Sequence, residues 1–164
     1  CCAVRGRPVV AVLDEQLGSR LLDIDPDAAV WECSHTGGHR FAPVLLLPGT
    51  GYTYGPAGID LAVRIVEGEL EGEVVTEHLR GRSTWPPAGQ VAEVAVRDSG
   101  VDAGIDDLRV EIDPENSRVA VVRHTDGRAW RVETDTRPLP DRKQSCRKPP
   151  TGAKAWFVES VTEL

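Results

Sequence analysis

The chain has 164 residues, of which 40% are hydrophobic and 27% are charged, as is usual for a soluble globular protein. This length allows one domain with a sizeable core, or one domain with a small addition. The formal net charge of −7 disfavours a nucleic-acid partner, because binding to phosphates requires a basic surface. No apolar run approaches the ~20 residues of a membrane span and no export signal is visible, so we expect a cytoplasmic protein without a membrane partner.

Methionine is absent, and the chain begins at Cys1. We therefore expect a fragment of a longer protein, truncated upstream of Cys1 and Cys2. The other two cysteines are Cys33 and Cys146. Without an export signal a disulfide framework is not expected, so metal binding, redox chemistry and simple burial remain open for these thiols.

The first half of the chain predicts helices and strands in alternation. Helical spacing of apolar residues predicts a helix over about 6–17, with the two N-terminal cysteines at or before its start. Residues 28–34 have the composition of a strand, in which Cys33 would be a small buried residue. Two apolar segments joined by Pro-Gly-Thr-Gly predict a hairpin over 44–55, and a second amphipathic helix is predicted over 59–70.

A strand before Cys1 would complete the order strand, helix, strand, hairpin, helix, which is the thioredoxin-like plan. The segment "FAPVLLL" is similar to the proline-before-strand segment of that plan, and it predicts a cis bond between Ala42 and Pro43. In this plan the loop before Val44 lies against the N-terminus of the first helix. The second half of the sequence follows a different pattern.

Residues 72–82 are interpreted as a linker or short helix, and a helix is predicted over 83–95, with prolines in its first turn. Alternating apolar residues separated by "DPEN" and "TDG" predict a three-stranded antiparallel meander over about 106–135. No helix or strand is predicted in the proline-rich tail. Cys146, which lies in this tail, is interpreted as an inert loop thiol. The fold class is therefore α/β to α+β.

This pattern predicts two regions. Residues 1–71 would form a thioredoxin-like ferredoxin domain whose first strand lies upstream, and residues 72–164 an α+β region with the meander. The four tryptophans are expected to be packing residues, and His78 and His124 have no visible partners in the sequence.

Two histidines, His35 and His39, flank a pair of glycines. Two imidazoles separated by flexible glycines can fold around one metal ion, whereas the simpler alternative is two surface or half-buried loop histidines. A zinc-protease motif is excluded because it requires a helix and a glutamate where Thr36 stands. A zinc site built from cysteine and histidine remains open.

The thioredoxin-like plan brings the histidine loop near the start of the first helix, where Cys1 and Cys2 lie. A helix N-terminus stabilises thiolates, which are the form that binds metal. Adjacent cysteines do not comfortably share one ion, so one of the pair is expected to be a bystander and a second thiolate to come from upstream.

The motifs "CCAVRGRP", "SHTGGHRFAPVLLLP" and "YGP" closely resemble the sucrase/ferredoxin-like family, a branch of the thioredoxin-like ferredoxins. "LRGRSTWPPAGQVAEVAVR" and "HTDGRAWRV" resemble its later region. The resemblance implies a [2Fe–2S] cluster held by two cysteines and two histidines. Carried onto this sequence, the ligands are Cys2, His35 and His39, with Cys1 as the alternative to Cys2. The second family cysteine has no counterpart here, so this chain alone is expected to bind the cluster poorly.

The resemblance implies an electron-transfer protein whose partner is a redox protein or a small-molecule electron donor or acceptor. Histidine in place of thiolate raises the potential, and its second ring nitrogen makes proton-coupled transfer an expectation. Two alternatives from other classes are a zinc-stabilised binding module that uses the same histidines and a thiol oxidoreductase that uses Cys1 and Cys2. Sugar hydrolysis requires two facing carboxylates, and no such pair stands out.

Overall fold

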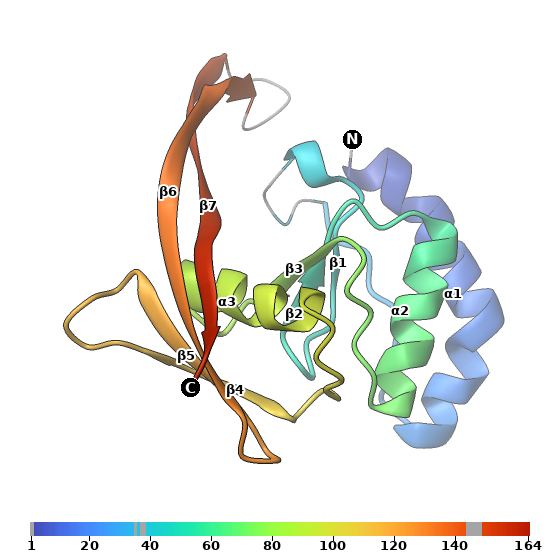
Figure 1. Ribbon diagram of the computed structural model, residues 1–164. Coiled ribbons are helices and arrows are strands. Elements are labelled where there is room, and N and C mark those ends of the chain that lie inside the picture. The colour runs from blue at the N-terminus through green and yellow to red at the C-terminus, as the bar shows by residue number, and fades with distance from the viewer. Residues whose placement is uncertain (1, 35, 37–38, 144–148) are drawn as a thin grey trace.

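The computed structural model describes residues 2–34, 36, 39–143 and 149–164, and for Cys2 and His39 the backbone only (Figure 1). Within these residues the chain forms three α-helices and two antiparallel sheets, which confirms an α+β fold. None of the helices in the described part is long and apolar enough to cross a membrane.

The first sheet has the strand order β1-β2-β3, and two helices cover one side of it (Figure 1). The predicted hairpin and second helix are confirmed, and the first helix is longer than predicted. The predicted strand over 28–34 is wrong, since this segment has no regular structure. The elements of this region are α1 (Cys2–Ile24), the short 3-10 helix η1 (His39–Phe41), β1 (Leu45–Leu46), β2 (Tyr52–Tyr54), α2 (Ile59–Glu71) and β3 (Leu79–Arg82).

Helices α1 and α2 pack through a periodic apolar stripe. Val9, Leu13 and Leu17 recur every fourth residue on α1, so that they lie on one face, and they form a buried cluster with Ala62 and Val66 of α2. Val30 and Leu45, from the segment that leads into the first sheet, pack against the same cluster.

Strand β3 replaces part of the predicted linker, and a glycine explains how closely it approaches the next helix. Gly81 has a φ of +92°, and a Cβ at this position would lie 2.7 Å from the Cβ of Gln90. A side chain is therefore excluded sterically, and glycine lets β3 pack directly on α3 (Pro87–Asp98).

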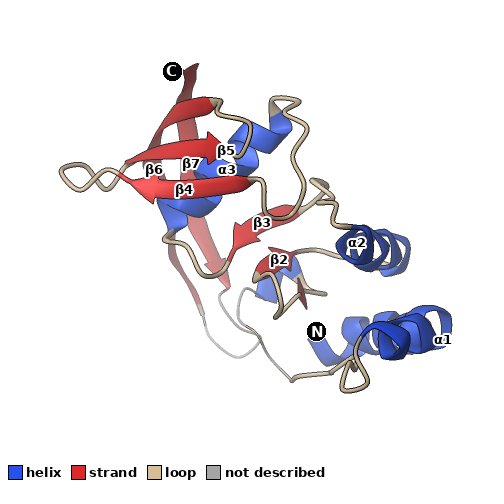
Figure 2. Cartoon of the chain, turned by 90° about the horizontal axis from the view of Figure 1, so that it is seen from below, coloured by secondary structure: helices blue, strands red, loops and turns tan. Residues whose placement is uncertain are grey.

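Helix α3 lies between the first sheet and the second (Figure 2). Its residues Ala92 and Val96 pack against Val122, Trp130 and the other buried side chains of the second sheet. The N-cap residue is Pro86, so the helix begins later than the prediction of 83.

The second sheet has the order β4-β5-β6-β7, and the predicted meander forms its first three strands. The last of these continues well beyond residue 135 and pairs with a further strand formed by the tail. Strand β5 pairs with β6 only over residues 129–133, so β6 and β7 extend past the sheet as a two-stranded ribbon (Figure 1). The strands are β4 (Leu108–Ile112), β5 (Val119–His124), β6 (Ala129–Lys143) and β7 (Pro150–Glu163).

A buried polar cluster joins the first sheet to α3. The Tyr52 hydroxyl donates to Glu93 Oε1 at 2.5 Å, and Arg97 Nε donates to the same oxygen at 3.2 Å. Arg97 also donates to the Tyr52 hydroxyl at 2.9 Å and to the carbonyls of Ala103 and Gly104. Burial, followed by the charge and hydrogen bond of Glu93, raises the pKa of Tyr52 to about 12. We call Tyr52, Glu93 and Arg97 the junction cluster.

Candidate functional site

The segment that carries the histidines is tied to the first turns of α1 at two points. Arg5 Nη1 donates to the Ala42 carbonyl at 3.3 Å, and Arg7 pairs with Glu32 at 3.3 Å. Both arginines lie within the first two turns of the helix, since α1 begins at Cys2. The prediction that the loop before Val44 lies against the start of the first helix is therefore confirmed.

The opposite side of this segment is held by the connection between β2 and α2. The Ala57 amide donates to the Pro43 carbonyl at 2.8 Å. A Cβ on Gly55 would lie 2.8 Å from the Phe41 carbonyl, so the glycine allows η1 to approach the end of β2 closely. The peptide bond between Ala42 and Pro43 is cis, as predicted.

Two of the three predicted ligands, Cys2 and His39, stand at the ends of these two contacting segments. Cys2 is the first residue of α1, and His39 is the first residue of η1. Their side chains lie outside the described residues, as do Cys1, His35 and Cys146 in full. The Arg5–Ala42 hydrogen bond therefore shows that the segments that carry Cys2 and His39 lie close together. It does not define the distance between the two ligand side chains.

Cys33 and Trp31 differ from the expectation of burial. Cys33 is an exposed free thiol, and Trp31 is 86% exposed. The reason is that residues 28–34 do not form a strand and so have no neighbouring strand to cover them. Cys33 lines a cavity of about 240 Å³ together with Gly6 of α1, Pro43 and other residues of the histidine segment.

Two arginines beside η1 were not anticipated. The guanidinium carbons of Arg40 and Arg80 lie 4.4 Å and 3.9 Å from the centroid of the Phe41 ring. Burial, and then the positive charge of Arg40, lower the pKa of Arg80. Among the described residues no carboxylate forms an ion pair with either arginine. The turn that begins at His39 is therefore bordered by unneutralised positive charge.

The remaining histidines have structural partners. His78 Nδ1 lies 2.6 Å from the Pro56 carbonyl oxygen, and His124 Nε2 lies 3.1 Å from that of Asp102. In the described part of the chain, no group of three or more histidine, cysteine, aspartate or glutamate side chains could hold a metal ion. The side chains of Cys2, His35 and His39 lie outside that part of the chain.

Fold and contacts define an α+β protein in which a histidine-bearing turn packs against the start of a cysteine-bearing helix. The family model described as Sucrase/ferredoxin-like matches residues 1–81. The first 81 residues therefore belong to the sucrase/ferredoxin-like family, which confirms the resemblance of the motifs within them; the quoted motifs of the later region lie outside the match. The match ends within β3, so it includes Cys2, His35 and His39 but none of the second sheet. No curated protein and no solved structure matches the chain.

Proposed function

We propose that the protein transfers electrons through a [2Fe–2S] cluster held by Cys2, His35 and His39. The observation that carries the proposal is the contact between the helix that begins at Cys2 and the segment that follows His39, through the Arg5–Ala42 hydrogen bond. Family membership over the same residues supports it. Such a cluster takes four protein ligands, so these three donors require one more.

The donor set suits this cofactor chemically. Thiolate and imidazole are the ligands found on [2Fe–2S] clusters, and a bound cluster supplies a site that accepts and releases one electron. The N-terminus of α1 contributes peptide N–H groups and the positive end of the helix dipole, both of which favour the thiolate form of Cys2.

The surrounding charge favours the reduced state. Neutral histidine in place of a thiolate removes one negative charge from the ligand set. Arg40 and Arg80 add positive charge beside the turn that begins at His39. Both effects stabilise an added electron, so we expect a higher potential than that of an all-cysteine ferredoxin.

The proposed partner is a redox protein or a small-molecule electron donor or acceptor, and the proposed location is the cytoplasm. The exposed free thiol of Cys33 supports a reducing compartment, because accessible thiols are readily oxidised elsewhere.

A visible absorption spectrum of the full-length protein, purified without oxygen, tests the proposal, together with analysis of iron, acid-labile sulfide and zinc. Iron and sulfide in equal amounts, with absorption that bleaches on reduction by dithionite, are expected. A colourless protein that holds zinc would overturn the proposal in favour of the zinc-stabilised binding module. A metal-free protein that forms a reversible disulfide would favour the thiol oxidoreductase.

A further inference from the structure

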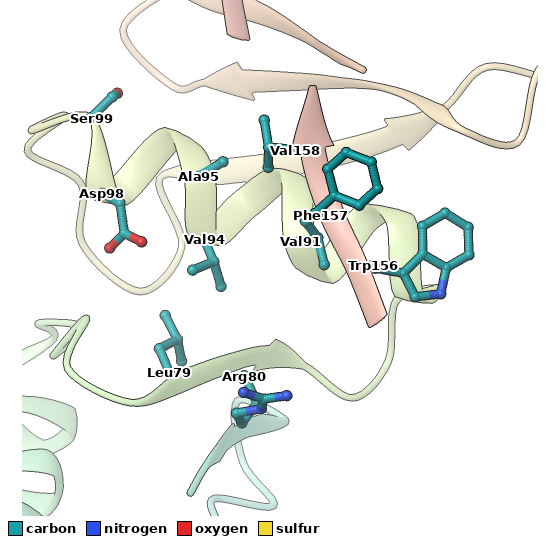
Figure 3. Close-up of a pocket in the computed structure, with 10 residues that line it drawn as sticks. All are labelled: Leu79, Arg80, Val91, Val94, Ala95, Asp98, Ser99, Trp156, Phe157 and Val158. Atoms are coloured by element: carbon teal, nitrogen blue, oxygen red, sulfur yellow. The ribbon is translucent and has the colours of Figure 1, made fainter. Parts of the chain in front are cut away.

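A cavity of about 580 Å³ lies between α3, β3 and the ribbon strand β7 (Figure 3). Small-molecule sites commonly measure about 300–1,000 Å³ and combine an apolar lining with a few polar groups. This cavity likewise combines a mostly apolar lining with a few polar side chains. It is lined by Leu79, Arg80, Val91, Val94, Ala95, Asp98, Ser99, Trp156, Phe157 and Val158.

Helix α3 presents a second apolar stripe to this cavity. Val91, Val94 and Ala95 follow the i, i+3, i+4 spacing of one helix face, and all three are half-buried. A different face of α3, which carries Ala92 and Val96, packs into the core of the second sheet. Val94 also packs against the core of the first sheet, whereas Val91 and Ala95 belong to neither of the core clusters beside α3, so the exposed part of this stripe is available to a ligand.

Aromatic side chains close one end of the cavity. In Figure 3, Val94 points toward Leu79 of β3, and Phe157 extends from β7, which crosses α3 in this view; all three residues line the cavity. Trp156 is next to Phe157 on β7, and both rings are half-buried. Flat rings with exposed surface at the end of an apolar slot suit a planar ligand, because aromatic pairs stack or meet edge to face.

Two arginines at the cavity have no ion pair among the described residues, and one acidic side chain, Asp98, lines the cavity. Arg80 lines it, and the Arg137 guanidinium carbon lies 3.6 Å from the centroid of the Phe157 ring. Neither arginine has an ion pair with a carboxylate in the described ranges, whereas Arg64 and Arg123 do. In a chain with a net charge of −7, this local excess of positive charge favours an anionic ligand.

One acidic side chain lines the cavity at the other end. Asp98 lies with Ser99 at the C-terminus of α3, away from Phe157 and Trp156 (Figure 3). A ligand with anionic groups at both ends would meet this carboxylate, so the cavity suits a single anionic group.

We propose that this cavity binds a planar aromatic monoanion, a carboxylate or sulfonate. Its ring lies between Phe157 and the Val91–Val94 stripe, and its anionic group lies at Arg80. The guanidinium of Arg80 offers paired N–H donors that match two oxygens of such a group. No residue of the cavity is a proposed cluster ligand, so this site does not depend on the proposed electron-transfer function.

Titration with 1-anilinonaphthalene-8-sulfonate, an aromatic monoanion that fluoresces when shielded from water, tests the site. One saturable site is expected. Arg80→Gln should weaken binding about tenfold or more, the effect of losing a hydrogen bond to a charged group. Arg80→Lys should retain part of the affinity. The matched control is Arg123→Gln, which makes the same charge change on β5 and should leave binding unchanged. Equal affinity of Arg80→Gln and wild type would overturn the proposal.

Competition on the wild-type protein makes the test independent of the folding of any variant. 2-Naphthoate should displace the probe, and the neutral isostere 2-naphthalenemethanol should be at least about tenfold weaker. Equal displacement by the two compounds would show a purely apolar groove and overturn the proposal. Phe157→Leu should weaken both the probe and 2-naphthoate, whereas Trp31→Ala, at an exposed tryptophan outside this cavity, should change neither.

Discussion

The two sheets of the molecule differ in regularity and in chemistry. The strands of the first sheet have two, three and four residues, whereas those of the second have five, six, fifteen and fourteen. The proposed ligands all belong to the first region, at a helix start and in the loop before β1. The difference follows a general pattern in which chemistry is carried by turns and loops that a regular scaffold holds in position.

The junction cluster connects these regions. Tyr52 comes from the first sheet, while Glu93 and Arg97 come from the helix that packs on the second. Glu93 is 0% exposed, and its Oε1 accepts two hydrogen bonds and lies 4.0 Å from Arg82 Nε, whereas its Oε2 has no hydrogen-bond partner among the described residues. The nearby positive charge of the arginines is what stabilises this buried carboxylate. We infer that the junction cluster fixes how the first sheet, and with it the histidine segment, is held against the second.

The largest expected effect concerns the ligands. In the full-length protein, Cys2→Ser should abolish the visible absorption of the cluster, because it removes a thiolate donor. The matched control Cys33→Ser, and also Cys1→Ser, should retain it. The measurement is absorbance per protein together with iron content. Loss of iron from Cys33→Ser or Cys1→Ser, with Cys2→Ser unaffected, would assign the ligand to the other cysteine.

The sequence predicts those parts of the fold that depend on local periodicity. Helix α2 was predicted because its apolar residues recur on one face, and the meander because its strands alternate and its turns have typical residues. Strand β3 was missed because "LRGR" has no apolar alternation, and its position depends on Gly81 against Gln90. The strand predicted at 28–34 failed because a strand requires a partner that local composition does not supply.

The same distinction applies to the sites. The two histidines lie four positions apart and the two N-terminal cysteines are adjacent, so each pair forms a recognisable local motif. The stacking of Arg80 on Phe41, in contrast, joins residues 39 positions apart, and the 580 Å³ cavity combines α3 with the strand formed by the tail. Such contacts arise only from tertiary packing, and no local pattern indicates them.

The junction cluster gives the second prediction. Arg97→Met should lower the free energy of unfolding by about 3–5 kcal/mol, because it leaves the Glu93 carboxylate buried without its main partner. The control Arg118→Met removes an exposed ion pair with Asp135 and should cost less than about 1 kcal/mol. Urea denaturation measures both. If Arg97→Met and Arg118→Met lowered the free energy of unfolding equally, the junction cluster would not act as a buried ionic contact. Adding Glu93→Gln to Arg97→Met should recover part of the stability, because the buried charge is then removed.

The third prediction concerns alkaline pH. Burial raises the pKa of Tyr52 to about 12 and also raises that of Tyr54, so the folded state favours both neutral phenols. Above pH ~10, the ordinary tyrosine pKa, the unfolded chain loses these protons first, and unfolding becomes more favourable. Stability is therefore fully present below pH ~10 and is lost as pH rises toward 12.

The expected loss is about 1.4 kcal/mol per pH unit for each tyrosine, the linkage slope for one proton. Urea denaturation at intervals from pH 9 to 12 measures it. Tyr52→Phe should flatten the slope, whatever its effect on stability at neutral pH. A variant with the wild-type slope would show that Tyr52 is not the titrating group.

The smallest expected effect is a local shift of potential, and it rests on the proposed cluster. Arg40 follows His39 directly and shares the Phe41 ring with Arg80, so Arg40→Gln removes positive charge beside the proposed centre. The added electron is then less stabilised, and the potential should fall by about 10–50 mV, or roughly 0.2–1.2 kcal/mol. Arg64→Gln makes the same charge change on α2, where Arg64 is exposed and paired with Glu77, and should shift the potential less.

Redox titration at low and high salt measures both variants. Arg40 and Arg64 are both exposed, so salt should weaken both effects, and the shift caused by Arg40→Gln should stay the larger of the two at each salt concentration. Equal shifts that both vanish in salt would reduce the effect to net charge and remove the specific role of the arginines on Phe41.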